Sequence, residues 1–505
     1  MYLTMVGKSH LHYTDKLIEK LAERGHTTDL IIARLNSGVA SNGTGSSRSI
    51  VSVDFPGGVS PWNKGAVSHL ENPFEEAPTW NPFKATFMTG FETITMELCE
   101  LVAHSPEVSA LLSSTKYDLA LLPAYDLCAF GVARGFGIHS LASYAATPLT
   151  TIQIAYGGNP ELPIYENMII DSLPDSDRNI FAHRVFETIR VLYDRLVYGI
   201  VIKKMNAMFA HRFGPNFPDA REIFANTSFD FANSHELLEE PRPISKKMKF
   251  IGGVGLPKPN KLNKEFDSLL NHSKKGTILF SFGTQVPSSK IPKDIVKTFV
   301  AAFQRFPEYT FIWKHDEPVE SNSSNIHCVS WLPQTDLLYD DRVVAFISHT
   351  GLNSLTEAAF AGVPVVAIPL FVDQIHNARR AQKLGLGVLI RKTEITVDSV
   401  SSALEAVLHD PSYRSRSKEV AKMLRRNPDD PTKVFVESVE FAAAFPNLHK
   451  HNTPSAVEFS FMAAHGWDVA VFLAFTATAL LILIAALTWK IVRTIGYSVQ
   501  KAKSD

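Results

Sequence analysis

Residues 346–374 read FISHTGLNSLTEAAFAGVPVVAIPLFVDQ, and this stretch decides the fold. An apolar run, Val343 to Ile347, predicts a buried strand that ends in a polar-glycine turn, and helical periodicity begins at about Asn353. A second apolar strand, Val363 to Leu370, follows, so the stretch predicts a β-α-β unit. Open α/β sheets bind ligands at the carboxyl ends of their strands, which makes this edge the first candidate for a site.

Five hydrogen-bonding side chains follow the two expected strands. His349 stands at the end of the first strand, Asn353 and Glu357 lie one helical turn apart, and Asp373 and Gln374 end the second strand. Backbone N–H groups at the helix start are unpaired and lie at the positive end of the helix dipole, which suits a phosphate. An ordinary β-α-β unit with polar loops explains the fold, but it does not explain five hydrogen-bonding side chains at the same edge. The pattern therefore predicts a polyhydroxylated, phosphorylated ligand.

Length and composition limit the class of protein. A chain of 505 residues is too long for one core, so we expect two domains and an appendage. The formal net charge of −1 provides no basic field for a nucleic acid. Cys99, Cys128 and Cys328 are too few and too scattered for a disulfide framework or a zinc site. One disulfide is compatible with them, but we expect buried free thiols.

Residues 467–489, WDVAVFLAFTATALLILIAALTW, predict a transmembrane helix. At about 1.5 Å per residue they can cross a hydrocarbon core of roughly 30 Å. Positive charge after the span places the tail in the cytoplasm and everything before it in a lumen. Lysines third and fifth from the end resemble a retrieval signal of endoplasmic reticulum residents, although lysine-rich tails follow many spans. The four sequons fit a luminal glycoprotein, but chance alone would supply a few: Asn42, Asn226, Asn271 and Asn322.

The second half of the chain alternates strands and helices. Strands are expected at 277–282, 309–314, 326–330 and 387–390, and helices at 291–306, 335–339, 374–384 and 397–408. This alternation predicts a parallel sheet covered by helices on both faces. The first half predicts a helix over 13–22, a strand over 28–32 and long loops over 36–90. No Gly-x-Gly-x-x-Gly follows a strand, which argues against a nicotinamide or flavin site.

The 346–374 stretch resembles the donor-binding motif of the UDP-glycosyltransferases, specifically the animal membrane-bound UDP-glucuronosyltransferase type. The Ser-His-x-Gly turn, the Asn-Ser pair, the Glu, the Pro-x-x-x-x-Pro strand and the Asp-Gln all occur at matching spacing. The resemblance is loose in the first half and tight from Gly276 to Gly387. It implies an α/β fold of GT-B architecture, in which two Rossmann-like domains face each other across a cleft. The expected parts are an acceptor-binding domain 1–255, a linker 256–275, a UDP-sugar-binding domain 276–445, a juxtamembrane segment 446–466, the span 467–489 and a tail 490–505.

The resemblance also implies roles for the donor-binding residues. Trp331 is expected to stack on the uracil ring, with Gln334 at its edge, although a core tryptophan is the alternative. Glu357 is expected to grip the ribose hydroxyls. The diphosphate would be touched by His349, Gly351, Asn353, Ser354 and Thr284, and the sugar hydroxyls by Asp373 and Gln374. No Asp-x-Asp metal motif appears where the diphosphate would bind, so we expect no metal, and the UDP-sugar is a co-substrate rather than a cofactor.

Glycosyl transfer to a hydroxyl needs a base, because an alcohol is a poor nucleophile at neutral pH. The family's base is a His in a Ser-His pair, which Ser9-His10 matches, with His12 as the local rival. The family orients this His with an acidic residue, but here Pro123 occupies that position. Asp126 could reach the imidazole or could cap the helix that follows.

The resemblance implies inverting transfer of a sugar, expected to be glucuronic acid, to a hydroxyl of a lipophilic small molecule. Glucose is the rival donor, and a catalytically impaired member that acts as a binding or regulatory partner is the second alternative. We expect a detoxifying, single-pass type I protein of the endoplasmic reticulum membrane, able to form homo- or hetero-oligomers. The acceptor cleft, or a loop pressed on the membrane, would use Trp62, Phe74, Trp80, Phe83, Phe87, Met88 and Phe91.

The amino terminus departs from the family. Members carry a signal peptide and a first strand, whereas the first six residues of this chain are too short for a signal peptide. We expect that the sequence starts late and that the first strand is missing. Translocation through the C-terminal span is the alternative.

Overall fold

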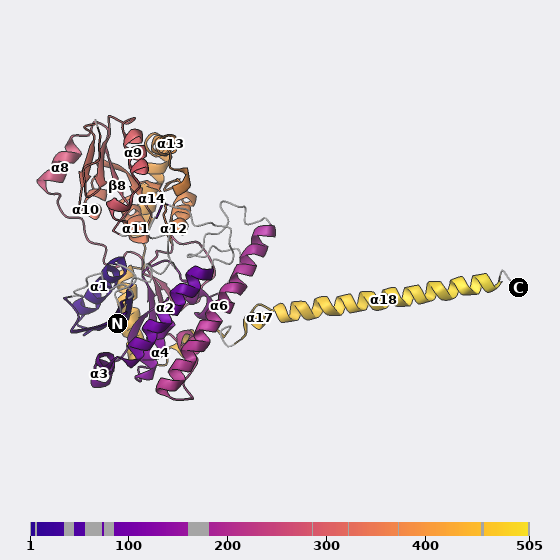
Figure 1. Cartoon of the computed structure of the whole chain (residues 1–505). Helices are drawn as coiled ribbons and strands as arrows, with labels where there is room; N and C mark the ends of the chain where they lie inside the picture. Colours follow the sequence, from indigo (N-terminus) through magenta and orange to yellow (C-terminus); the bar gives the residue numbers. More distant parts are fainter. Residues whose placement is uncertain are drawn as a thin grey trace. The chain divides into compact units, whose positions relative to one another are not determined.

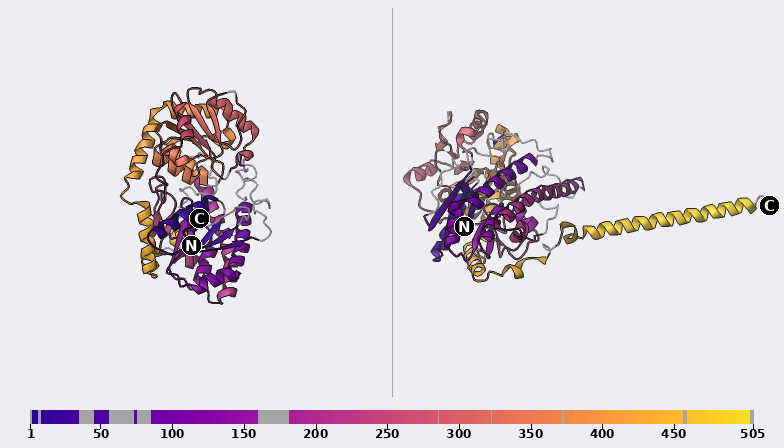
Figure 2. Two further views of the ribbon diagram at one scale, coloured as in Figure 1. Left: turned by 90° about the vertical axis from the view of Figure 1, so that its left-hand side faces the viewer. Right: turned by 60° about the horizontal axis from the view of Figure 1, so that its bottom comes forward.

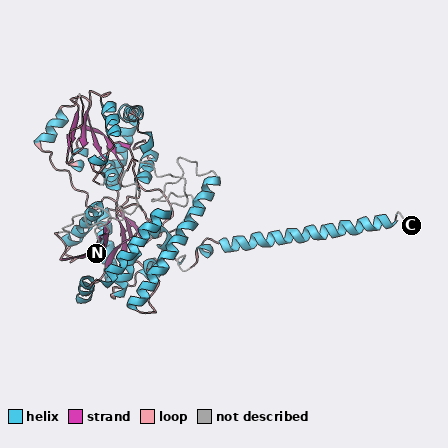
Figure 3. Cartoon of the chain, viewed as in Figure 1, coloured by secondary structure: helices cyan, strands magenta, loops and turns pink. Residues whose placement is uncertain are grey.

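A computed structural model describes residues 2–5, 8–34, 45–55, 73–74, 85–159, 181–284, 286–321, 323–371, 373–455 and 459–502. The chain forms two units, Met1–Thr453 and Pro454–Asp505 (Figure 1). The first unit contains parallel sheets flanked by helices, as the strands and helices of Figure 3 show. Its two lobes are called here the N lobe and the donor lobe, after the order of the chain and the expected ligand.

The donor lobe is built on one parallel sheet of strand order β10-β9-β8-β11-β12-β13. The strands are β8 (Thr277–Ser281), β9 (Thr310–Lys314), β10 (Ile326–Val329), β11 (Val343–Ser348), β12 (Val365–Ala367) and β13 (Gly387–Leu389). Alternate residues of β8 enter different cores: Ile278 and Phe280 join an aromatic cluster, and Leu279 joins an aliphatic one. Helices therefore cover both faces, which explains why these strands read as continuous apolar runs.

The helices of the donor lobe follow the expected alternation. They are α8 (Lys264–Asn271), η3 (Ser288–Lys290), α9 (Lys293–Phe303), α10 (Gln334–Leu338), α11 (Leu352–Ala361), α12 (Asp373–Lys383), η4 (Lys392–Glu394), α13 (Val397–His409) and α14 (Pro411–Arg425). Helix α8 falls within the expected linker, but its Phe266 and Leu270 are buried in the aliphatic core of the donor lobe. The connection between the lobes is therefore shorter than 256–275.

The N lobe contains two smaller parallel sheets, of order β1-β2-β3 and β4-β5-β6-β7. The strands are β1 (Tyr2–Met5), β2 (Asp29–Arg34), β3 (Ser49–Asp54), β4 (Ala120–Pro123), β5 (Leu141–Ala145), β6 (Asp230–Ala232) and β7 (Met248–Phe250). The expectation of a missing first strand is wrong: β1 pairs with β2 over its whole length, with Tyr2 opposite Ile31 and Met5 opposite Arg34. Four residues are enough to form this strand because the edge of β2 provides their hydrogen-bonding partners.

The helices of the N lobe are α1 (Lys8–Glu23), α2 (Ala85–His104), α3 (Pro106–Ser114), α4 (Leu127–Gly135), α5 (Thr151–Tyr156), α6 (Phe181–Phe213) and α7 (Ala220–Ala225). The chain then returns to this lobe at its end. Helix α15 (Pro431–Ala444) was expected in the donor domain, but Phe435 and Val439 pack against Tyr13 and Phe231. Figure 2 shows α14 and α15, in orange to yellow, running along one side of the unit. A short helix, α16 (His449–Asn452), follows.

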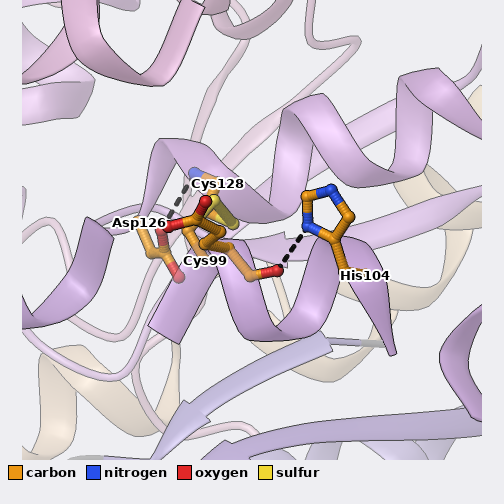
Figure 4. The surroundings of a disulfide bond; sticks show 5 residues. Cys99, His104, Asp126 and Cys128 are labelled. Atoms are coloured by element: carbon orange, nitrogen blue, oxygen red, sulfur yellow. Dashed lines mark hydrogen bonds between the residues drawn. A yellow bond between two sulfur atoms is a disulfide. The ribbon is translucent and has the colours of Figure 1, made fainter. Parts of the chain in front are cut away.

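Cys99 and Cys128 form a disulfide, which corrects the expectation of free thiols (Figure 4). Their Cα atoms lie 5.6 Å apart, at a sequence separation of 29. The sequence spacing could not show that α2 brings Cys99 against the first turn of α4. Cys328 is free and only partly buried.

The second unit contains α17 (Phe461–Ala464) and the long helix α18 (Trp467–Ala502). Among the described residues, Trp467–Ser498 is the helix long and apolar enough to cross a membrane, with a mean hydropathy of 2.6 in its most apolar window. No part of that window is buried. This helix contains the span expected at 467–489.

Candidate functional site

Three neighbouring strands of the donor lobe bring most of the expected donor residues to one edge. Strand β11 lies between β8 and β12, and all three run parallel. Their carboxyl ends therefore lead together into Thr284, His349 and Asp373, which are more than 20 positions apart in the sequence. The tertiary structure thus confirms that the expected residues share an edge, while their contacts with a ligand remain predictions.

The ring of His349 lies between two glycines. A Cβ atom built on Gly283 would lie 2.6 Å from His349 Cε1, and one built on Gly351 would lie 2.6 Å from Nε2. Only glycine permits this approach at either position, and Gly283 also has a φ of +76°. Burial lowers the pKa of His349 to about 4, and the nearby charge of Lys314 acts in the same direction. His349 is therefore neutral at physiological pH.

Thr350 has a left-handed backbone, with φ +56°, and is the one such non-glycine residue in the described part of the chain. This conformation is costly for a β-branched residue and marks a site where the surroundings impose it. The Thr350 hydroxyl donates to the carbonyl of Gln374 at 3.1 Å, and Asn377 Nδ2 donates to the Thr350 carbonyl at 3.0 Å. These contacts tie the end of β11 to α12 and set the direction in which α11 begins.

Helix α11 begins without a side-chain cap. Its N-cap is Gly351, which provides no side-chain hydrogen bond to the first turn. Asn353 lies in this first turn, and its Oδ1 accepts a hydrogen bond at 3.1 Å from Asn233 Nδ2 of the N lobe. Sequence reasoning missed Asn233, because nothing in the sequence relates a position after β6 to α11.

Gln334, Ser354 and Glu357 form a hydrogen-bonded group beside this helix. Gln334 Nε2 donates to Ser354 Oγ at 3.2 Å and to Glu357 Oε2 at 2.7 Å. Burial raises the pKa of Glu357, while the bond from Gln334 and the charge of Lys16 oppose that rise. Lys16 comes from α1 of the N lobe and packs against Gly255, whose Cβ would lie 3.0 Å from Lys16 Cβ. A cation from the opposite lobe therefore faces the expected ribose site, which sequence reasoning did not predict.

Trp331 is 69% exposed, which excludes the alternative of a core tryptophan. The buried tryptophan of this lobe is instead Trp313. Lys314, at the end of β9, lies over the Trp331 ring at 5.8 Å and donates to the Gly283 carbonyl at 2.8 Å. Lys314 was also missed, although a lysine that ends an apolar strand at the carboxyl edge is a signal that could have found it.

Asp373 and Gln374 differ in what they offer a ligand. Asp373 accepts a hydrogen bond from Asn377 Nδ2 at 2.8 Å, and burial raises its pKa despite this bond. Gln374 is buried, and its Oε1 accepts from the backbone of Leu370 at 2.9 Å and of Phe371 at 3.3 Å. Gln374 thus shapes the loop with its oxygen, and its contact with a sugar remains a prediction.

The expected base, His10, lies in the first turn of α1, and its Nδ1 is 2.9 Å from the Tyr125 hydroxyl. Burial lowers the pKa of His10 to about 4. Burial also raises the pKa of Tyr125 well above its usual value, with Tyr144 and Asp126 adding to the effect. A neutral imidazole therefore meets a protonated phenol. His12, the local rival, is exposed.

Asp126 caps helix α4. Its Oδ1 accepts a hydrogen bond from the Cys128 backbone at 2.9 Å, and its side chain is buried (Figure 4). The sequence allowed two roles for Asp126, contact with the imidazole of His10 or capping of the following helix, and the structure shows the cap. The carboxyl group holds the turn that contains Tyr125, and its role toward His10 remains a prediction.

The expected acceptor loops fall largely outside the described residues, as do Trp62, Trp80, Phe83 and the side chains of Phe87, Met88 and Phe91. Phe74 is described, and it is buried in the aromatic cluster of the donor lobe, with its ring 5.5 Å from that of Phe282. Lys392 Nζ donates to the adjacent Pro73 carbonyl at 3.0 Å. Phe74 thus joins this part of the N-terminal half to the donor lobe instead of lining a cleft.

A buried ion pair also links the lobes. His376 Nε2, on α12, lies 3.0 Å from Glu239 Oε1, and both side chains are less than a tenth exposed. Burial alone would raise the pKa of Glu239, but the hydrogen bond and charge of His376, together with Arg242, lower it to about 2. Among the described residues, no group of three or more His, Cys, Asp or Glu side chains could hold a metal ion.

The two-lobed architecture is shared with solved glycosyltransferases. The structure of the glycotransferase of kitacinnamycin matches with a TM-score of 0.59 at 17% identity, over 87% of this chain and 97% of that one. The structural relatives are GT-B glycosyltransferases, and the α/β fold described above is of this class.

The family model of UDP-glucoronosyl and UDP-glucosyl transferase matches residues 3–502, and the chain belongs to this family. It is 27% identical over 456 residues to UDP-glucosyltransferase 2 of Dactylopius coccus, covering 89% of this chain and 84% of that protein. It is 29% identical over 405 residues to UDP-glucuronosyltransferase 1A10 of Homo sapiens, covering 80% of this chain and 74% of that protein. The chain is therefore a UDP-sugar glycosyltransferase, and its relatives include both glucosyltransferases and glucuronosyltransferases.

Proposed function

We propose that this chain transfers glucuronic acid from UDP-glucuronate to a hydroxyl of a lipophilic small molecule, with inversion at the anomeric carbon. The observation that carries the proposal is the convergence of His349, the uncapped start of α11 and the Gln334–Glu357 pair at one sheet edge. These groups suit the diphosphate, through helix N–H groups, and a ribose diol, through the Glu357 carboxylate. The exposed face of Trp331 suits the uracil ring.

His10 is proposed as the general base. Its Nδ1 faces the Tyr125 hydroxyl, so the tautomer with a proton on Nδ1 leaves the Nε2 lone pair for the acceptor. The acceptor hydroxyl transfers its proton to Nε2 while its oxygen bonds to the anomeric carbon. The bond from that carbon to UDP breaks, and UDP leaves with the electron pair. Attack opposite the leaving group inverts the centre.

The leaving UDP gains negative charge, which the donor lobe is arranged to meet. The α11 dipole points its positive end at the expected diphosphate. Lys314 adds a cation, which Gly283 and Trp331 hold close to His349. A preorganised positive potential of this kind stabilises the transition state more than the substrate.

The alternative of a catalytically impaired, donor-binding member has one specific observation in its favour. The group that hydrogen-bonds His10 is a phenol, whereas the family pattern provides a carboxylate. A neutral phenol stabilises the developing imidazolium less than an anion does. The donor edge is complete under this alternative too, so UDP would still bind.

We further propose that the first unit lies in the lumen of the endoplasmic reticulum and that α18 anchors the chain as a type I protein. The Cys99–Cys128 disulfide supports an oxidising compartment. The apolar helix Trp467–Ser498 supports an anchor. Positive residues after its apolar part, Lys490 and Arg493, support a cytoplasmic tail.

The experiment that tests the proposal uses membranes containing the full chain, a pool of phenolic acceptors, and labelled UDP-glucuronate or UDP-glucose. We expect a β-glucuronide as product. His10→Ala should lower transfer by about 10² or more, the contribution of a positioned general base. UDP should raise the thermal stability of His10→Ala as it does that of the native chain. His12→Ala is the matched control and should keep its activity.

The outcomes separate the alternatives. Transfer of glucose alone would assign the chain to the glucosyltransferases. UDP stabilisation without transfer of either sugar would favour the impaired, regulatory member. If UDP raised no thermal stability and neither sugar moved, the transferase proposal would be lost.

A further inference from the structure

The chain that enters helix α12 is shaped by the side chain of Gln374. Leu370, Phe371, Asp373 and Gln374 are called here the sugar loop, because the last two are expected to hold the sugar. Gln374 Oε1 accepts hydrogen bonds from the backbone N–H groups of Leu370 at 2.9 Å and of Phe371 at 3.3 Å. The position of Leu370 therefore sets where the Gln374 side chain lies, and a group that fixes Leu370 also acts on the sugar end of the site.

Lys392 holds the carbonyl side of Leu370. It follows β13, which pairs with β12, so it lies at the same carboxyl edge of the sheet. Its Nζ donates a hydrogen bond to the Leu370 carbonyl at 2.9 Å. Because Leu370 is buried, water is poorly placed to replace the ammonium group, and a hydrogen bond from a charged donor is stronger than one between neutral groups. Lys392 therefore fixes the first residue of the sugar loop.

The same ammonium group also binds a segment of the N-terminal half. Lys392 Nζ donates to the Pro73 carbonyl at 3.0 Å, and Pro73 comes between β3 and α2 in the chain. The next residue, Phe74, is buried in the aromatic cluster of the donor lobe, with its ring centroid 5.5 Å from that of Phe282. Phe282 in turn packs on Phe280, with the ring centroids 4.9 Å apart, so the donor lobe itself forms the seat for Phe74. A segment far from the donor residues in sequence thus reaches their loop through one lysine.

We propose that Lys392 and Phe74 are positioning residues for the sugar end of the donor site. Phe74 seats Pro73 so that its carbonyl holds the ammonium group of Lys392, and the ammonium group holds Leu370. The inference rests on the proposed function, in which the sugar loop holds the sugar of the donor. The groups expected to bind UDP lie on other elements, namely Trp331, α10 and α11, so binding of UDP alone does not need this arrangement.

The test compares the binding of UDP with that of UDP-sugars. Isothermal titration on the full chain in detergent micelles gives the Kd of UDP, UDP-glucuronate and UDP-glucose. For the UDP-sugar that the native chain transfers, Lys392→Met should raise the Kd by about tenfold, through the loss of a charge-assisted hydrogen bond to the loop. The Kd of UDP should stay as it is. Lys392→Arg, which keeps a cationic donor at this position, should restore most of the affinity.

Phe74→Ala should raise the same Kd, because Pro73 loses its anchor on the donor lobe. Phe306→Ala is the matched control. Phe306 is a buried ring of the same aromatic cluster, but it comes just before β9, at the amino edge of the sheet. Both variants should lower the melting temperature, whereas only Phe74→Ala should weaken the binding of the UDP-sugar relative to UDP. A purely structural role of Phe74 would give the two variants the same ratio of affinities.

A double variant tests whether the two residues act through the same loop. Phe74→Ala combined with Lys392→Met should raise the Kd of the UDP-sugar by about tenfold and not by about a hundredfold, because each change releases the same contact. Lys275→Met removes a lysine of the same lobe that donates to Glu308, and this control should keep the native affinities. UDP-dependent thermal stabilisation checks that each variant is folded.

Two outcomes would overturn the positioning role. One is a Lys392→Met variant that binds the UDP-sugar as the native chain does, and the other is a variant that loses affinity for UDP and the UDP-sugar equally. Asp373→Asn separates this failure from failure of the proposed function. If Asp373→Asn raises the Kd of the UDP-sugar and Lys392→Met does not, only the positioning role is lost. If Asp373→Asn leaves that Kd unchanged, the sugar loop does not hold the sugar, and the proposed donor site fails with the inference.

Discussion

The Tyr125 hydroxyl lies 2.9 Å from Nδ1 of His10, across 115 positions of sequence. The phenol thus takes a place beside the histidine that the family pattern pairs with a carboxylate. It reaches that place because Asp126 caps α4 and the disulfide holds Cys128 in the first turn of the same helix. The orientation of the proposed base therefore depends on one short turn.

Replacing Tyr125 by Phe should lower kcat by about tenfold and leave the KM for the UDP-sugar unchanged. The loss of one hydrogen bond to the imidazole, about 1 to 1.5 kcal/mol, frees the ring to rotate and to change tautomer. Steady-state kinetics at saturating donor measures this split. Tyr117→Phe, which removes a hydroxyl that donates to Asp29 elsewhere in the lobe, should leave kcat as it is. An unchanged kcat in Tyr125→Phe would show that the phenol does not position His10.

Replacing Gly283 or Gly351 by Ala should weaken UDP binding by tenfold or more. In both cases the new Cβ lies 2.6 Å from the His349 ring, so the ring must leave its place. Isothermal titration with UDP measures the loss. Gly25→Ala has the same left-handed strain as Gly283→Ala but nothing within 4 Å, and Gly199→Ala is the unstrained counterpart of Gly351→Ala. Equal UDP affinity in the Gly351→Ala variant and its control would contradict the role of the ring.

Stability should fall as the pH is lowered from about 6.5 to 4. The folded pKa values of His10 and His349 are about 4, below the unfolded value of 6.5, so only the unfolded state takes up these protons in that window. Each histidine then removes up to about 1.4 kcal/mol per pH unit. Thermal melts from pH 7.5 to 4.5 measure the slope, and His10→Gln should reduce it. A slope equal in the native chain and in His10→Gln would argue against the lowered pKa of His10.

Breaking the Glu239–His376 pair should destabilise the first unit by about 3 kcal/mol or more, because one partner stays buried without the other. Calorimetry on Glu239→Gln, His376→Gln and the double variant gives the coupling energy. The folded pKa of Glu239, about 2, lies below the unfolded value of 4.5, so its contribution holds above pH 4.5 and is lost as the pH falls toward 2. Additive effects in the cycle would show that the two side chains do not interact.

Reducing the Cys99–Cys128 disulfide should cost about 3 to 4 kcal/mol, the loop-closure entropy of a separation of 29 residues. It should also lower kcat, since Cys128 lies three positions after Tyr125. Melting temperature and kcat with and without a reductant measure both effects. Cys328→Ala is the control, because that thiol is free. A melting temperature that does not respond to reductant would mean that the bond contributes nothing to stability.

The donor lobe was largely predictable. Its central strands are buried on both faces and appear as continuous apolar runs, and the polar residues after them mark the carboxyl edge, as at His349 and Asp373. The errors fall where a segment depends on distant partners. Strand β1 is short and forms because β2 is present, and α15 packs on the N lobe although it follows the donor lobe in sequence.

The sequence by itself determined the family, the parallel sheet of the donor lobe, and which residue types line its edge, because these depend on periodicity and local spacing. Only the tertiary structure decided the contacts between positions far apart: Tyr125 on His10, Cys128 on Cys99, Glu239 on His376, and Lys16 and Asn233 facing the donor site. These contacts join separate elements, and their energies depend on distance and burial. Neither quantity exists until the chain has folded.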